Sequence, residues 1–238
     1  MSLAPGCFAA AAAALDNPGY DRPGLGFTPA VLAPGSVTWE QGLPDASRDS
    51  GGTQYAADGL LRLGIGHALE LQLGSSYNRF DPRGAGSSDG RGDTTLGLKF
   101  ALPARGAFSW GLLGSMEFTD GTRAFRNARR QYLLGADANW QWSARGTAAL
   151  YLENVRSGGR DSTLLAVNDG CAITPTLGGY VELAVQDDAG DGHGSRVGAG
   201  LAWMPTPRVQ LDASARHRVG GRAPDWEAGL GVSVYFGH

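Results

Sequence analysis

The sequence has 238 residues, which is enough for one domain or at most two. Its 38 glycines follow neither a collagen repeat nor the composition of a flexible linker, so both classes are excluded. The formal net charge of −3 gives no electrostatic support for nucleic-acid binding, and no such partner is expected.

Residues 1–15 resemble the end of a signal peptide. The small residues from Ala9 to Ala14 offer A-x-A-like cleavage sites, although no Lys or Arg precedes them. We therefore expect export, with an atypical or truncated signal peptide. The longest apolar run, Phe8 to Leu15, is too short to span a bilayer as a helix.

Residues 16–34 are rich in proline and glycine and do not alternate as a strand does. Two interpretations of this extended segment stay open. In the first, it folds into the interior of the following domain and narrows it as a plug, with Arg22 meeting an inward acidic residue. In the second, it is a flexible tail.

From residue 35 to residue 238, apolar and polar residues alternate with period two, as in 69–73 and 209–216. Successive side chains of a strand point to opposite faces, so each segment has an apolar and a polar face. We count about twelve such segments. They begin near Ser36, Thr53, His67, Gly92, Ala107, Arg130, Gly146, Ser162, Thr176, Arg196, Arg208 and Asp225.

Short and long links alternate between these segments. The short links are residues 64–67, 103–106, 143–146, 174–176 and 205–207, and the long ones are 44–52, 77–91, 119–129, 156–161, 187–195 and 217–224. Outer-membrane barrels have short periplasmic turns and long extracellular loops. Residues 35–238 are therefore predicted to form an all-β, antiparallel up-and-down transmembrane β-barrel of about twelve strands, with both termini periplasmic.

A soluble barrel or β-sandwich also alternates, and the tryptophans favour the membrane barrel over it. In this register every tryptophan falls on the apolar face. We interpret them as a lipid-facing aromatic girdle, made of Trp39, Trp110, Trp140, Trp142, Trp203 and Trp226.

Charged residues occupy the opposite face, and acids outnumber bases. The predicted lumen-lining residues are Glu40, Asp58, Arg62, Glu70, Lys99, Glu117, Asp137, Glu153, Glu182, Arg196, Asp212, Arg216 and Glu227. Charges of both signs in a lumen indicate either a wetted pore or a salt-bridged plug. Asp169 does not fit, because its register turns it toward lipid; either its strand carries a bulge or the register is wrong there.

Several motifs resemble the outer-membrane transporter family named for the meta-pathway of phenol degradation, over roughly residues 20–236. They are Asp21-Arg22-Pro23-Gly24, Pro34 to Glu40, Leu60 to Ile65 with Leu69-Glu70-Leu71, Gly92 to Phe100, Tyr180-Val181-Glu182, Leu211-Asp212 and Pro224-Asp225. The resemblance implies a barrel that passes small, hydrophobic compounds. Barrels of this kind usually end on an aromatic residue that the insertion machinery reads, whereas Gly237-His238 follows Phe236 here.

Motifs for catalysis are not visible. The sequence offers no phosphate-binding loop, no metal-ligand spacing and no Ser/His/acid arrangement, so neither a cofactor nor enzyme activity is expected. We expect contact with outer-membrane lipid, with lipopolysaccharide through loop arginines such as Arg126, with the barrel-insertion machinery and with an unidentified small solute. The first hypothesis is a passive channel in the outer membrane. The alternatives are a closed structural or surface-binding barrel and, less favoured, a barrel-embedded lipid hydrolase.

Overall fold

The computed structural model describes residues 17–84, 86–190 and 192–237. The signal peptide expected at residues 1–15 lies outside these residues, as do Cys7 and His238. In the described part of the chain, no helix is both long and apolar enough to cross a membrane.

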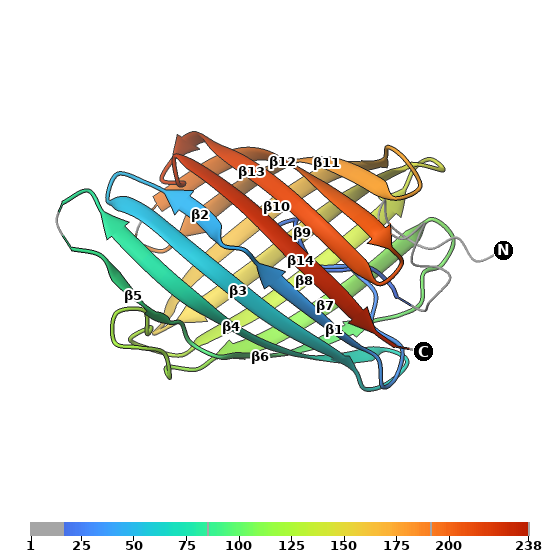
Figure 1. Ribbon diagram of the computed structural model, residues 1–238, viewed down its shortest axis with the longest axis horizontal. Helices are drawn as coiled ribbons and strands as arrows, with labels where there is room; N and C mark the ends of the chain where they lie inside the picture. Colours follow the sequence, from blue (N-terminus) through green and yellow to red (C-terminus); the bar gives the residue numbers. More distant parts are fainter. Residues whose placement is uncertain (1–16, 85, 191, 238) are drawn as a thin grey trace.

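The alternating segments form one antiparallel sheet that closes into a barrel (Figure 1). Closure comes from pairing of the first and last strands, from Val37 opposite Phe236 to Gly42 opposite Gly231. The strands are β1 (Val37–Gly42), β2 (Asp45–Arg48), β3 (Gly52–Gly64), β4 (Leu69–Pro82), β5 (Ser88–Arg91), β6 (Thr95–Ala101), β7 (Phe108–Glu117), β8 (Gln131–Gln141), β9 (Gly146–Ser157), β10 (Arg160–Ala172), β11 (Leu177–Asp188), β12 (Gly192–Thr206), β13 (Val209–Gly221) and β14 (Trp226–Phe236).

The 14 strands make 12 crossings of the barrel, as predicted. β1 and β2 both pair with β3 and β14, so they are one crossing interrupted at Leu43 and Pro44. Proline has no N–H to donate to the ladder, which explains the break. β5 and β6 both pair with β4 and form a second interrupted crossing.

The short turns, the start of β1 and the end of β14 share one end of the barrel (Figure 1). At the other end, the strands run further than expected. β9 and β10 are joined only by Gly158 and Gly159, both with positive φ, and β4 extends to Pro82. The strands continue to pair beyond the apolar band of the barrel. There, apolar and polar residues no longer alternate, so the sequence does not indicate where the strands end. Residues 118–130 remain a long loop.

Residues 17–36 lie inside the barrel, at the end where the termini are (Figure 1, dark blue). They have no regular secondary structure. Tyr20 and Leu32 of this segment pack with Met204 and Tyr235 of the wall in a buried cluster. We call residues 17–36 the inserted segment, since it enters the lumen and returns to the start of β1.

Candidate functional site

A buried ion-pair network joins the inserted segment to β1, β3 and β4. Arg62 donates to Glu40 Oε1 from Nη1 and to Glu70 Oε1 from Nε, both at 2.8 Å, and all three side chains are fully buried. The backbone of the inserted segment completes the shell. Arg62 Nη1 donates to the Gly19 carbonyl at 3.1 Å, and Leu32 N donates to Glu70 Oε2 at 3.0 Å. Each buried charge therefore has a partner.

Lys99 and Asp21 extend this network to β6. Lys99 Nζ lies 3.0 Å from Glu70 Oε1 and 3.2 Å from Asp21 Oδ1. Asp21 also lies 3.5 Å from Arg62 and accepts a hydrogen bond from Gln72 Nε2 at 3.0 Å. Asp21 belongs to the inserted segment, so its carboxylate balances part of the positive charge on the wall.

Arg22 reaches the wall on the side of β2, β13 and β14. It donates to both carboxylate oxygens of Asp45, and its Nη2 lies 3.2 Å from Asp212 Oδ1. Two glycines of β14 leave room for this cluster: a Cβ at Gly229 would overlap Asp45, and one at Gly231 would overlap Arg22. The small inner face of β14 thus accommodates the segment.

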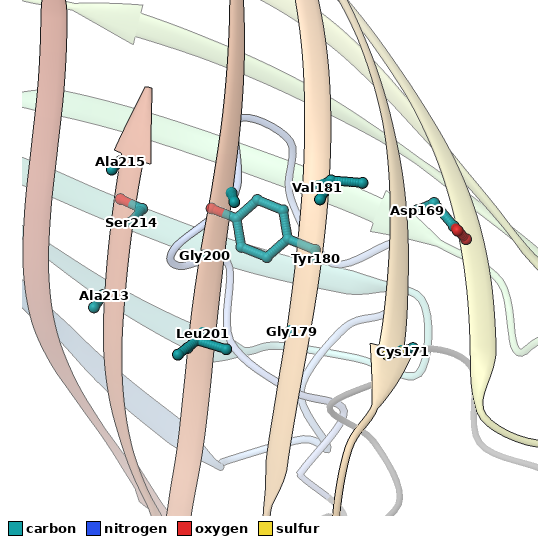
Figure 2. Close-up of a pocket in the computed structure, with 11 residues that line it drawn as sticks. Asp169, Cys171, Gly179, Tyr180, Val181, Gly200, Leu201, Ala213, Ser214 and Ala215 are labelled. Atoms are coloured by element: carbon teal, nitrogen blue, oxygen red, sulfur yellow. The ribbon is translucent and has the colours of Figure 1, made fainter. Parts of the chain in front are cut away.

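A third attachment involves β11, β12 and β13. The Pro23 carbonyl accepts hydrogen bonds from Tyr180 Oη at 3.1 Å and from Arg216 Nη2 at 3.0 Å. Arg216 also donates to Glu182 at 2.6 Å. The Tyr180 ring lies against Gly200 of the neighbouring strand, which has no side chain in the way (Figure 2).

The tip of the inserted segment carries an apolar cluster. The Phe27 ring meets Tyr151 edge-on, with centroids 5.8 Å apart and planes at 85°. The cluster also contains Leu164, Ala166 and Ala184 of the wall. An apolar patch therefore interrupts the polar inner face at the level of the tip.

Two cavities lie in the lumen beyond the inserted segment, toward the end away from the termini. One, of about 310 Å³, is lined by Asp58, Gln72, Ser115 and Glu117 among others. The second, of about 220 Å³, adjoins it at Asp58 and is lined by Arg216 and Glu227. Together they form a space lined by acidic, polar and leucine side chains that we call the vestibule.

The structure places the predicted lumen-lining residues in several groups. Glu40, Arg62, Glu70, Lys99, Glu182, Asp212 and Arg216 contact the inserted segment or one another. Asp58, Glu117 and Glu227 line the vestibule, and Arg196 pairs with Glu227 at 3.1 Å. Glu153 accepts a hydrogen bond from Tyr151 at 2.5 Å, and Asp137 lies beside Gly26.

Exposed aromatic side chains form two unequal bands on the outer surface. Trp39, Trp110, Trp140, Trp142 and Trp203 all lie toward the end that holds the short turns. Only Trp226 among the tryptophans lies toward the other end, where the exposed Tyr77 and Tyr132 accompany it. These two tyrosines were not among the residues predicted for the girdle, and they have the amphipathic ring that suits an interface.

Asp169 does point outward, and its strand has no bulge at that position. Its carboxylate accepts a hydrogen bond from Trp142 Nε1 at 3.0 Å, close to the short turns. It lines a furrow of about 550 Å³ on the outer side of β10–β13, beside Gly179, Val181 and Leu201 (Figure 2). The predicted register of this strand is therefore correct. Asp169 faces outward, where the indole N–H of Trp142 is its hydrogen-bond partner.

Asp93, in the motif from Gly92 to Phe100, has a structural role. Its carboxylate accepts hydrogen bonds from Gly121 N and Asn127 N, both at 2.7 Å, and so fastens the loop 118–130. In the opposite direction, Asp120 accepts from Thr94 N at 2.8 Å. This backbone hydrogen bond, with help from the Thr94 hydroxyl, lowers the pKa of the Asp120 carboxyl.

Sequence reasoning missed Asp21, Asp45 and Phe27 as members of the site. Asp21 and Phe27 lie in a segment without periodicity, and Asp45 lies in a predicted link. A signal was present for Asp21, because it directly precedes Arg22 in the motif on which the family resemblance rests. Nothing in the local pattern points to Asp45 as the acidic partner of Arg22.

Comparison with known proteins agrees with this architecture. The model of a family described as "Putative MetA-pathway of phenol degradation" matches residues 20–236. Among solved structures, the barrel is similar to the COG4313 outer membrane channel from Pseudomonas putida F1, with a TM-score of 0.69 and 15% identity over 87% of this chain and 97% of that one. It is also similar to the KdgM porin, with a TM-score of 0.60 and 11% identity over 84% and 99%. No curated protein matches the sequence.

Proposed function

Because the chain belongs to the family described as "Putative MetA-pathway of phenol degradation", we propose that it is a passive outer-membrane channel for small solutes, with apolar or aromatic compounds among them. The two similar structures are those of an outer membrane channel and a porin, which supports a channel fold. The observation that carries the proposal is the vestibule, an open space inside a closed barrel that borders the inserted segment at Gln72 and Asp45, the partners of Asp21 and Arg22.

The inserted segment sets the width of the proposed pathway. A barrel of twelve strands is intermediate between one filled by side chains and one with a wide aqueous channel. Here the segment fills the end of the lumen near the termini, with attachments on β1, β2, β3, β4, β6, β11, β13 and β14. We infer that it acts as a plug, so solutes pass beside it or when part of it moves.

The apolar cluster at the tip supports apolar or aromatic solutes. Phe27 and Tyr151 pack edge-on in a buried apolar cluster inside the lumen, so their rings become available to a solute when the tip of the segment moves. An aromatic solute that reaches them gains stacking and apolar contact of about 0.5–1.5 kcal/mol per ring pair beyond area burial. The proposed order is entry to the vestibule, contact with the cluster, and release toward the end with the termini.

One observation favours a second candidate, a closed barrel without transport. Arg62, Glu40 and Glu70 are fully buried, and the inserted segment completes their hydrogen bonds. Breaking such a network by removing one partner costs about 3–5 kcal/mol, so a segment held this way has reason to stay in place. In a closed barrel, the loops at the end away from the termini would bind the partners of the protein.

Flux measurements separate the two candidates. Purified barrels in planar bilayers should give discrete current steps in KCl, and vesicles containing them should take up phenol faster than vesicles without protein. Heat-modifiable migration on gels controls for folding. No current over many confirmed insertions, together with unchanged phenol uptake, would refute the channel and favour the closed barrel.

A further inference from the structure

A polar cavity separates the inserted segment from the wall formed by β8, β9 and β10. Its volume is about 90 Å³. Asp137, Asn139, Thr147 and Asn168 line it from the wall. The ion pairs of the segment lie on other strands of the barrel. On this wall the segment is held by a hydrogen bond from the Phe27 backbone to Asp137 and by the contact of Phe27 with Tyr151, and the cavity remains as a seam beside these contacts.

Asp137 points into this seam without a full set of partners. Its side chain is buried, at 4% exposure, and its Oδ1 has no hydrogen-bond partner in the structure. Its Oδ2 lies against Gly26, where a Cβ would overlap it. Asn139, two residues further along β8 and on the same face, also has a buried oxygen without a partner. Buried oxygens of this kind are costly unless a donor or a cation satisfies them.

The other charges around the cavity already have partners. Arg22 pairs with Asp45 and Asp212, and Asp21 pairs with Lys99. Among the carboxyl and guanidinium groups that line the cavity, the Asp137 carboxyl is the one without an ion pair in the described structure. A volume of about 90 Å³ has room for one small cation and a water or two, since a water occupies about 30 Å³.

We propose that Asp137 and Asn139 form a binding site for a small monovalent cation in the seam between the inserted segment and β8–β10. A carboxylate and an amide oxygen are hard ligands that suit such an ion, with water completing its shell. The site lies beside Phe27, on the side of the apolar cluster toward the termini. If the barrel conducts, this site should make it prefer cations, and that consequence rests on the proposed channel function. The binding site itself does not depend on the channel function.

Reversal potentials in a KCl gradient test the consequence. We expect the wild type to prefer K⁺ over Cl⁻, and Asp137→Asn to lower the permeability ratio at least about threefold. Adding Asn139→Asp to that variant returns a carboxylate to the same cavity and should restore the preference. Asp169→Asn is the matched control, because Asp169 faces outward. An unchanged ratio in Asp137→Asn, with normal gel migration, overturns the consequence.

Crystals of the wild type grown with thallium(I) test the site without relying on current. The expected result is an anomalous peak within contact of Asp137 Oδ1 and Asn139 Oδ1 that disappears in Asp137→Asn. No peak in the wild type overturns the site even if the barrel conducts. A peak in a barrel that passes no current contradicts the proposed channel and supports the cation site.

Discussion

Arg22 donates two hydrogen bonds to Asp45, from Nη1 to Oδ2 at 2.9 Å and from Nη2 to Oδ1 at 3.0 Å. This bidentate pair joins the inserted segment to β2, the short strand that follows the break at Pro44. Asp212 and the Leu230 carbonyl accept further bonds from the same guanidinium. Arg22 is thus the side chain through which the segment is fixed to the wall near the vestibule.

Replacing Arg22 by Met should loosen this side of the segment. The substitution removes the pair with Asp45 and leaves Asp212 without its cation, so repulsion between the two acids favours a displaced segment. We expect a single-channel conductance at least about twofold higher, or frequent larger substates. The matched control is Arg79→Met, which removes an exposed pair with Asp81 far from the segment. Equal conductance in both variants would argue against Arg22 as an anchor.

Replacing Arg62 by Met should destabilise the barrel itself. Glu40 would remain fully buried without a cation and Glu70 would keep Lys99 alone, and breaking a buried ion pair in this way costs about 3–5 kcal/mol. The midpoint of urea unfolding in detergent, followed by tryptophan fluorescence, should fall accordingly. The triple variant with Glu40→Gln and Glu70→Gln removes the stranded charges and should regain part of the loss. A single variant as stable as the wild type would contradict the role of Arg62 in the buried network.

Substitution of Gly64 should prevent the inserted segment from returning to β1. A Cβ at Gly64 would overlap the carbonyl oxygens of Leu32 and Ala33, which are backbone atoms and cannot move aside cheaply. Gly64→Val is therefore expected to raise conductance and to expose a cysteine placed at Leu32 to a water-soluble thiol reagent. Gly66→Val is the control, because nothing lies within 4 Å of a Cβ there. Slow labelling in both variants would contradict the close approach of residues 32–33 to β3.

The loop 118–130 should respond to acid through Asp120. The hydrogen bond from Thr94 N lowers the pKa of Asp120, so the carboxylate stabilises the attached loop above the pKa of an unfolded aspartate, about 3.9. That contribution disappears as the pH falls through the lower folded value. The hydrogen-exchange protection factors of residues 118–130, which are corrected for the intrinsic rate at each pH, should therefore stay high at neutral pH and fall only in strong acid. Asp120→Asn should exchange faster at neutral pH, and identical exchange in the two proteins would refute the attachment.

The strands and their order could be predicted from the sequence. In a barrel, the alternation of apolar and polar residues corresponds to the two faces of each strand, and the lengths of the links correspond to its turns and loops. Leu69 to Leu73 and Val209 to Arg216 lie in β4 and β13, with the predicted faces. The far ends of the strands could not be placed, since residues 156–161 form a polar hairpin that no apolar face marks. The break at Pro44 was also not recognised, although the missing N–H of proline is its physical cause.

The site was harder to predict than the wall. Arg22 was expected to meet an inward acid and does so, but the main acid is Asp45, which lay in a predicted link. The pairing of Arg62 with Glu40 and Glu70 depends on strand neighbours that are far apart in the chain. Asp169 appeared anomalous because the donor that satisfies it, Trp142, comes from a turn between two other strands.

In the proposed function, the inserted segment narrows a channel through this barrel. Single-channel conductance of the wild type should be compared with that of a variant lacking residues 17–34, both checked by heat-modifiable gel migration. Removing the segment opens the end of the lumen that it fills, so we predict a conductance several times higher and faster uptake of phenol by vesicles. An unchanged conductance in the correctly folded deletion variant would contradict the claim.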